Sequence, residues 1–255
     1  MSKHIFLIIF SFLILVGCQQ PTDEEKPAIV SVGIVGSRAD VDSIFVEAKE
    51  LRLRTSSDSI VIFNGSANYN LLRKRGDDPD YIASDVSMDA TTISDVRIKI
   101  DKAVVWKNGK SQNMTIPQSL VNGYTLTVEE GSIMSGTEYN IVILVDIARS
   151  VIKTKSNNYY LRPVAKAVVV ATTGKITGKL SGWTNNPTLY AIYGLIDTVS
   201  STKPDTSGAF TFSYLEPKTY RISVHDTLNF IKNYPPGSFY TVKRDEVTQT
   251  GDLLR

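Results

Sequence analysis

The sequence predicts an all-β protein: two antiparallel β-sandwich-like domains that follow an N-terminal signal helix and a flexible tether. Residues 51–54 and 96–100 alternate apolar and charged side chains with a period of two, which is typical of strands with one face in water. Residues 141–145 and 167–170 are unbroken apolar runs rich in β-branched residues, as in strands covered on both faces. Asn-Gly pairs, which favour hairpin turns, lie at 64–65, 108–109 and 122–123, the middle pair within a good hairpin candidate.

The first 17 residues have the pattern of a secretory signal peptide. Lys3 and His4 give a short cationic start, and residues 5–16 are apolar except for Ser11. Twelve helical residues span about 18 Å, which is too short for a hydrocarbon core of about 30 Å. A buried core helix is the alternative, but a terminal helix this uniformly apolar has no polar face for water.

The signal pattern ends at the only cysteine of the chain. Leu15, Val16 and Gly17 precede Cys18, and this tetrad resembles the lipobox of bacterial lipoproteins. The resemblance implies that a diacylglyceryl group alkylates the Cys18 thiol and that Cys18 becomes the new N-terminus. A lone free thiol is a liability in an oxidising compartment, and lipidation gives it a use. We expect the mature protein to be anchored to a membrane through this lipid rather than to span it.

Residues 18–29 are mostly polar with two prolines, and we interpret them as a flexible tether. The acidic run at 23–25 is similar to the surface-export signals of Bacteroidetes lipoproteins, although a solvated linker would have the same composition. We therefore expect a bacterial outer-membrane location, facing either the periplasm or the exterior.

A domain boundary is expected near residues 172–173, giving a first β-domain over 30–172 and a second over 173–255. The second segment opens with Gly174-Lys175-Ile176-Thr177-Gly178, continues through the hairpin-like stretch 205–210, and enters a later strand at 215–220. This pattern resembles the carboxypeptidase regulatory-like module, a prealbumin-type sandwich. Lys218 stands where that module usually has a glycine. The resemblance implies a non-catalytic spacer or binding platform.

The first segment is similar to the bacterial family called domain of unknown function 4382. The similarity rests on four stretches in the order of that family, at residues 41–46, 95–99, 145–151 and 160–164. It implies an exported, often lipidated β-domain that is commonly followed by a sandwich module. The family has no established catalytic residue, so none is transferred to this chain.

Composition excludes several kinds of chemistry. The net charge of +2 gives no strong field to recruit nucleic acid. One cysteine and two histidines make a zinc site improbable, and no phosphate-binding glycine loop opens a helix, so we predict no cofactor. His225 follows Ser223 and precedes Asp226, but neighbours along a strand do not converge as a catalytic triad must. We therefore predict no catalytic residues and no enzyme.

Three weaker candidates concern ligands. The acidic turn with Asp77, Asp78 and Asp80 offers carboxylates to calcium but lacks the spacing of an EF-hand loop, and a solvated turn is the alternative. Asp146 lies inside an apolar run, where a buried carboxylate needs a partner such as Arg149 or backbone N–H groups, unless it binds a ligand. Trp183 lies in a loop-like context where its ring can stack on a sugar, although aromatic rings in sandwiches usually belong to the core.

These observations favour a cell-envelope lipoprotein with a non-catalytic role in binding, adhesion or assembly at the membrane surface. Its expected partners are the membrane, through the lipid anchor, and a glycan or an envelope protein. One alternative is a glycan-active hydrolase with a carboxylate pair in the first domain, since such pairs are set by spatial separation rather than by sequence. Another is an accessory subunit of an outer-membrane complex.

Overall fold

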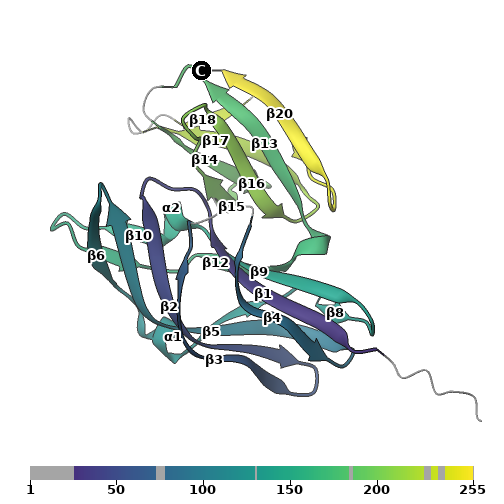
Figure 1. Ribbon diagram of the computed structural model, residues 1–255. Helices are drawn as coiled ribbons and strands as arrows, with labels where there is room; N and C mark the ends of the chain where they lie inside the picture. The colour runs from purple at the N-terminus through teal and green to yellow at the C-terminus, as the bar shows by residue number, and fades with distance from the viewer. Residues whose placement is uncertain are drawn as a thin grey trace, which may run out of the picture.

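A computed structural model describes residues 26–72, 78–129, 131–183, 186–226, 231–234 and 239–254 (Figure 1). The predicted signal peptide and most of the predicted tether lie outside the described residues. The all-β prediction is confirmed, because strands make up most of the described chain and the helical elements are short. Those elements are α1 (Gln118–Asn122), α2 (Ile147–Ser150) and the 3₁₀-helix η1 (Val170–Thr172).

Two sheets form the first sandwich. A four-stranded sheet has the order β12-β9-β1-β4, and an eight-stranded sheet has the order β10-β11-β6-β5-β2-β3 with β7 and β8 also paired to β5. Most pairs are antiparallel, but β1 pairs with β9, and β11 with β6, in parallel. The bounds are β1 (Ala28–Gly36), β2 (Ser43–Thr55), β3 (Ser59–Asn70), β4 (Asp80–Met88), β5 (Thr91–Lys107), β6 (Lys110–Thr115), β7 (Tyr124–Thr127), β8 (Ser132–Ile133), β9 (Glu138–Val145), β10 (Val151–Lys153), β11 (Tyr159–Leu161) and β12 (Ala165–Val169).

The alternating segments place their apolar residues between these sheets. In β2, Leu51 and Leu53 are fully buried, whereas Arg52 and Arg54 reach the outer face. The paired stretch of β5 repeats this alternation from Val96 to Ile100. The outer face of this sheet is a ladder of charged residues, where Glu50 pairs with Lys99 at 3.1 Å and Arg54 with Asp95 at 3.2 Å.

Two further sheets form the second sandwich. One has the order β16-β13-β20, with β13 and β20 parallel, and the other has the order β15-β14-β17-β18 with β19 also paired to β17. Figure 1 shows these strands, coloured green to yellow, above the strands of the first sandwich. The bounds are β13 (Gly174–Ser181), β14 (Thr188–Tyr193), β15 (Asp197–Thr202), β16 (Ala209–Leu215), β17 (Thr219–His225), β18 (Ile231–Tyr234), β19 (Tyr240–Thr241) and β20 (Val247–Leu254).

The three Asn-Gly pairs have different outcomes. Asn108 and Gly109, at φ 52° and 71°, form the two-residue turn between β5 and β6, where Lys107 pairs with Lys110. Two successive positive φ values are what a type I′ turn requires, so the hairpin prediction is confirmed. The pair at 64–65 instead lies inside β3, and Gly123 ends α1 at φ 117°.

The unbroken apolar run of β9 is buried on both faces, as predicted. Ile141, Ile143 and Val145 face the core of the first sandwich. Val142 and Leu144 face the other way, into a third apolar cluster that contains Tyr214 of the second sandwich. The second sandwich therefore covers the outer face of the four-stranded sheet.

Candidate functional site

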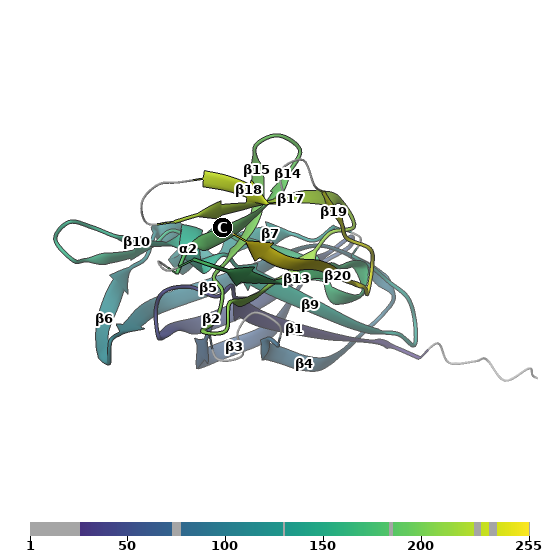
Figure 2. The ribbon, with the colours of Figure 1, turned by 90° about the horizontal axis from the view of Figure 1, so that it is seen from above.

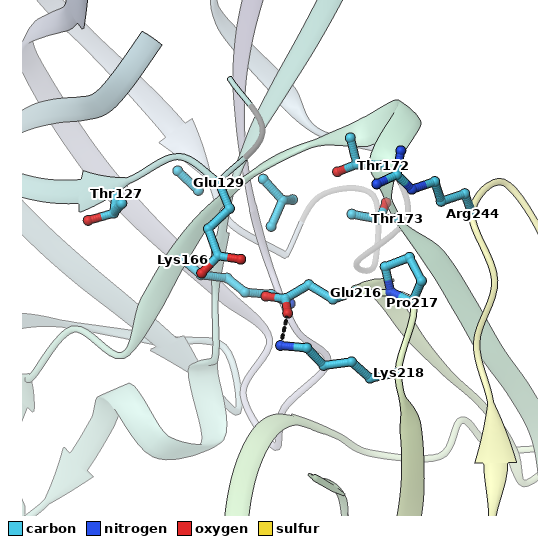
Figure 3. Close-up of a pocket in the computed structure, with 11 residues that line it drawn as sticks. Thr127, Glu129, Lys166, Thr172, Thr173, Glu216, Pro217, Lys218 and Arg244 are labelled. Carbon is cyan, nitrogen blue, oxygen red and sulfur yellow. Dashed lines mark ion pairs between the residues drawn. The ribbon is translucent and has the colours of Figure 1, made fainter. Parts of the chain in front are cut away.

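The candidate site is a pocket of about 320 Å³ between the two sandwiches (Figure 3). The first sandwich contributes Thr127 and Glu129, at and after the end of β7, and Lys166 on β12. The second contributes the turn between β16 and β17 and Arg244, which precedes β20. The polar and charged lining residues are Thr127, Glu129, Lys166, Thr172, Thr173, Glu216, Lys218 and Arg244.

Strand alternation points Lys166 into this pocket. Ala167 and Val169 face the core of the first sandwich, so Lys166 and Val168 face the second. The Lys166 Nζ donates a 2.7 Å hydrogen bond to the carbonyl oxygen of Tyr214. Burial lowers the pKa of Lys166 from 10.5 to about 8, while the negative charges of Glu216 and Glu129 act in the opposite direction.

A bulge in β16 places the Tyr214 carbonyl and ring at the interface. Phe210 and Phe212 face the core of the second sandwich, and the register with β13 then shifts by one residue before Leu215. The extra residue returns Leu215 to the core and turns Tyr214 outward, with φ at 56°. The Tyr214 ring packs on Val35, Val142, Leu144 and Val168 of the first sandwich.

The turn after β16 supplies the other charges of the pocket. Glu216 and Lys218 form an ion pair across Pro217, drawn as a dashed line in Figure 3. This pair raises the pKa of Lys218. The Lys218 ammonium also lies 5.1 Å from the centre of the Tyr193 ring. The Tyr220 hydroxyl donates to the Glu216 carbonyl oxygen at 2.9 Å, which fixes the turn to β17.

A second polar contact between the sandwiches surrounds Asp146. Its side chain caps α2 by accepting a 3.2 Å hydrogen bond from the Arg149 backbone N–H, and it also accepts one from the Ser201 hydroxyl. The Arg149 guanidinium lies 3.5 Å from the Asp146 carboxylate and donates to the Thr198 carbonyl oxygen at 2.7 Å. Burial raises the pKa of Asp146, and the bonds to Ser201 and Arg149 oppose that rise. In this structure, therefore, Asp146 links the two sandwiches.

The other candidates from the sequence lie apart from this pocket. Trp183 follows β13 and lines a separate cavity of about 610 Å³, together with Arg38, Lys203 and Asp205. His225 ends β17 beside Tyr190, with the two ring centres 6.3 Å apart. Cys18 and its lipobox residues Leu15, Val16 and Gly17 lie outside the described residues.

The predicted acidic turn is only partly described. Asp77 lies outside the described residues, Asp78 precedes β4, and Asp80 begins that strand. Among the described residues, no group of three or more His, Cys, Asp or Glu side chains is arranged to hold a metal ion. Over the same part of the chain, no helix has both the length and the apolarity needed to cross a bilayer.

Sequence reasoning missed Lys166, Glu129, Glu216 and Lys218. One signal was present, because Lys166 is a charged residue next to an apolar run that was predicted to be buried on both faces. A charge at such a position needs a partner, and the partner is a main-chain carbonyl 48 residues further along the chain.

A family model described as "Domain of unknown function (DUF4382)" matches residues 27–163, which is more than half of the chain. The chain belongs to the DUF4382 family. The DUF4382 match includes Glu129 and Asp146 and ends before Lys166, so the pocket lies at the edge of the family region. No curated protein sequence matches the chain.

Several solved structures match the DUF4382 chain distantly. The TIE protein of Bacillus anthracis matches over 89% of this chain and 34% of its own, at 10% identity and a TM-score of 0.25. This chain thus spans about a third of that protein. The shaft pilin SpaA from Lactobacillus rhamnosus GG matches over 90% of this chain and 96% of its own, at 8% identity and a TM-score of 0.24. A Bacteroides ovatus protein described as "a putative cell adhesion protein" matches over 89% of this chain and 91% of its own, at 10% identity and a TM-score of 0.23.

Proposed function

We propose that this protein is a cell-envelope lipoprotein, anchored through Cys18, whose two sandwiches form one rigid, non-catalytic body for binding or assembly at the membrane surface. The observation that supports the rigid body is the interface itself. It combines the Tyr214 ring in an apolar cluster with hydrogen bonds from Lys166, Ser201 and Arg149. Contacts of both kinds resist hinge motion between the sandwiches.

The charges of the pocket act mainly within the protein. Lys166 is bonded to the Tyr214 carbonyl, and Glu216 is paired with Lys218. Groups engaged in this way hold the two sandwiches and the turn in place, which favours a structural role for the pocket over turnover of a substrate.

We further propose that residues 173–255 are a separate domain of the carboxypeptidase regulatory-like, prealbumin-like type. What supports this is the turn before β16. The Asp205 carboxylate accepts hydrogen bonds from the backbone N–H groups of Ser207 at 2.8 Å and Ala209 at 2.9 Å. Gly208 adopts φ 84° in the same turn, where a Cβ atom would lie 2.3 Å from the Leu180 carbonyl oxygen. This geometry gives a physical reason for the aspartate and the glycine in the hairpin-like stretch 205–210, where Asp205, Gly208 and Phe210 follow the pattern Asp-x-x-Gly-x-Phe.

The anchor is tested by metabolic labelling with an alkyne fatty acid, followed by cell fractionation. We expect the wild-type chain to be labelled and recovered with outer membranes. The Cys18→Ser variant should lose the label and leave that fraction, whereas the control Gln19→Ser should behave as wild type. An unlabelled wild-type protein would overturn the lipid anchor.

The hydrolase alternative expects a carboxylate pair within the first domain, whereas the two carboxylates that line one pocket, Glu129 and Glu216, come from different sandwiches. It is tested by incubating the purified protein with peptidoglycan and with envelope polysaccharide and measuring new reducing ends. We expect no release. Release that disappears in both Glu129→Gln and Glu216→Gln would establish the hydrolase instead.

The complex-subunit alternative makes a different prediction. Extraction in mild detergent, followed by affinity purification of the full chain, would recover a stoichiometric membrane-protein partner if the chain is a dedicated subunit. Recovery of the chain alone would favour a free-standing binding protein.

A further inference from the structure

The hairpin between β14 and β15 has an unusually apolar tip. Tyr193 pairs with Asp197, and the three residues between them, Gly194, Leu195 and Ile196, form the loop. Leu195 and Ile196 are 85% and 87% exposed, more than any other large apolar side chain among the described residues. Figure 2 shows this loop projecting beyond the rest of the second sandwich, at the top of the view.

The tip is held in a defined shape. The Arg221 guanidinium, on the neighbouring strand β17, donates to the carbonyl oxygens of Gly194 at 3.3 Å and Leu195 at 2.8 Å. Gly194 has φ 63°, so the loop contains a backbone conformation that other residues rarely adopt. A buttressed loop presents its two aliphatic side chains without first having to become ordered.

The surroundings of the tip identify its chemical partner. Behind the aliphatic residues lie the half-exposed ring of Tyr193 and the ammonium of Lys218, which are 5.1 Å apart. The aliphatic side chains at the end and the Tyr193 ring behind them match the acyl chains and the interfacial layer of a lipid bilayer. The charges behind the tip are mixed, because Lys218 is paired with Glu216 and the exposed Asp197 follows Ile196. A protein interface of ordinary strength needs about 800 Å² from each partner, which a narrow tip with two apolar residues does not offer.

We propose that Leu195 and Ile196 insert into the surface of a lipid bilayer and form a second, non-covalent membrane contact beside the lipid anchor. The proposal depends on the proposed function only for bringing the body close to a membrane. A tether over residues 18–29 extends at most about 40 Å, so an acylated Cys18 keeps the body near the bilayer. A second contact would orient the body relative to that surface.

The test uses the full acylated chain in vesicles of phosphatidylethanolamine and phosphatidylglycerol that carry bromine on their upper acyl carbons. The variant Ile196→Trp places an indole at the tip, and Met134→Trp places one at a site 64% exposed in the first sandwich. The wild-type signal from Trp106 and Trp183 is subtracted. We expect the indole at position 196 to shift to the blue and lose most of its fluorescence, while the indole at position 134 shows neither change.

The outcomes separate this proposal from the anchor. A protein that does not co-float with vesicles refutes the anchor. A protein that floats but whose indole at position 196 behaves like that at position 134 refutes insertion of the tip. A blue shift that depends on protein concentration without lipid assigns the tip to a second copy of the chain and also overturns the proposal. As a second variant, Leu195→Ser combined with Ile196→Ser should float as the wild type does but become more accessible to added protease.

Discussion

The Lys166 ammonium of one sandwich donates to the Tyr214 carbonyl of the other at 2.7 Å, immediately beside the apolar cluster in which the Tyr214 ring is buried. One bulged residue thus provides both an apolar and a polar contact across the interface. Because the bond satisfies only one of three ammonium N–H groups in a partly buried place, it does not fully offset the cost of burial. That cost appears as the lowered pKa of Lys166.

The lowered pKa of Lys166 predicts how stability depends on pH. The unfolded chain holds the Lys166 proton up to about pH 10.5, whereas the folded chain releases it from about pH 8. Between these values Lys166 binds more protons in the unfolded state, so the contribution of Lys166 to the free energy of unfolding should rise with pH. Urea unfolding at intervals between pH 7 and 10 checks this. The free energy of unfolding of the wild type, measured relative to that of Lys166→Met, should rise across this range, and a constant difference between the two proteins would show that Lys166 is not responsible.

Removal of the Tyr214 ring should weaken the interface. We expect Tyr214→Ala to lower the free energy of unfolding by about 3 kcal/mol, because it leaves a cavity among Val35, Val142, Leu144 and Val168. Tyr214→Phe keeps the ring and should lower the free energy of unfolding by much less. Calorimetry should show a lower Tm for the alanine variant, with the two sandwiches melting in separate transitions. A wild-type Tm would mean that the ring does not stabilise the interface.

The Asp146 carboxylate both caps α2 and accepts a hydrogen bond from the second sandwich. Two replacements can separate the effect of its hydrogen bonds from the effect of its charge. Asp146→Ala removes the acceptor for the Arg149 N–H and the Ser201 hydroxyl. It should lower the free energy of unfolding by about 2 kcal/mol. Asp146→Asn keeps one acceptor oxygen and should cost less than half of that. Urea unfolding at pH 7 compares them, and equal losses would argue that the charge on Asp146, rather than its hydrogen bonds, matters.

The turn at Asn108 and Gly109 offers a purely conformational test. A Cβ atom at Gly109 would meet nothing within 4 Å, yet the residue has φ 71°. Gly109→Ala should therefore cost about 1 kcal/mol through backbone strain alone. Asn108→Gly, which relieves a positive φ at the other turn position, should change stability by less than that. Thermal unfolding of the pair checks the prediction, and a neutral alanine variant would contradict it.

Local patterns were enough to predict most of the fold. The alternation of Leu51 with Arg52 predicted correctly that β2 has one face in water. The unbroken apolar run of β9 predicted correctly that this strand is buried on both faces. The interface could not be predicted, because it depends on the bulge before Leu215. This bulge shifts the register by one residue and turns Tyr214 to the outer face, and nothing in the composition of the segment indicates it. The pocket was missed for a different reason. Glu129, Lys166 and Glu216 are far apart in the sequence and meet only after the sandwiches pack.

The proposed lipid on Cys18, which would hold this double sandwich at a membrane, can be detected by intact-protein mass spectrometry. The full chain, expressed in a bacterial host and extracted from its membranes, should begin at Cys18 and carry the added mass of a diacylglyceryl group. A membrane-extracted chain that keeps residues 1–17, or that begins at an unmodified Cys18, would rule out the lipid anchor.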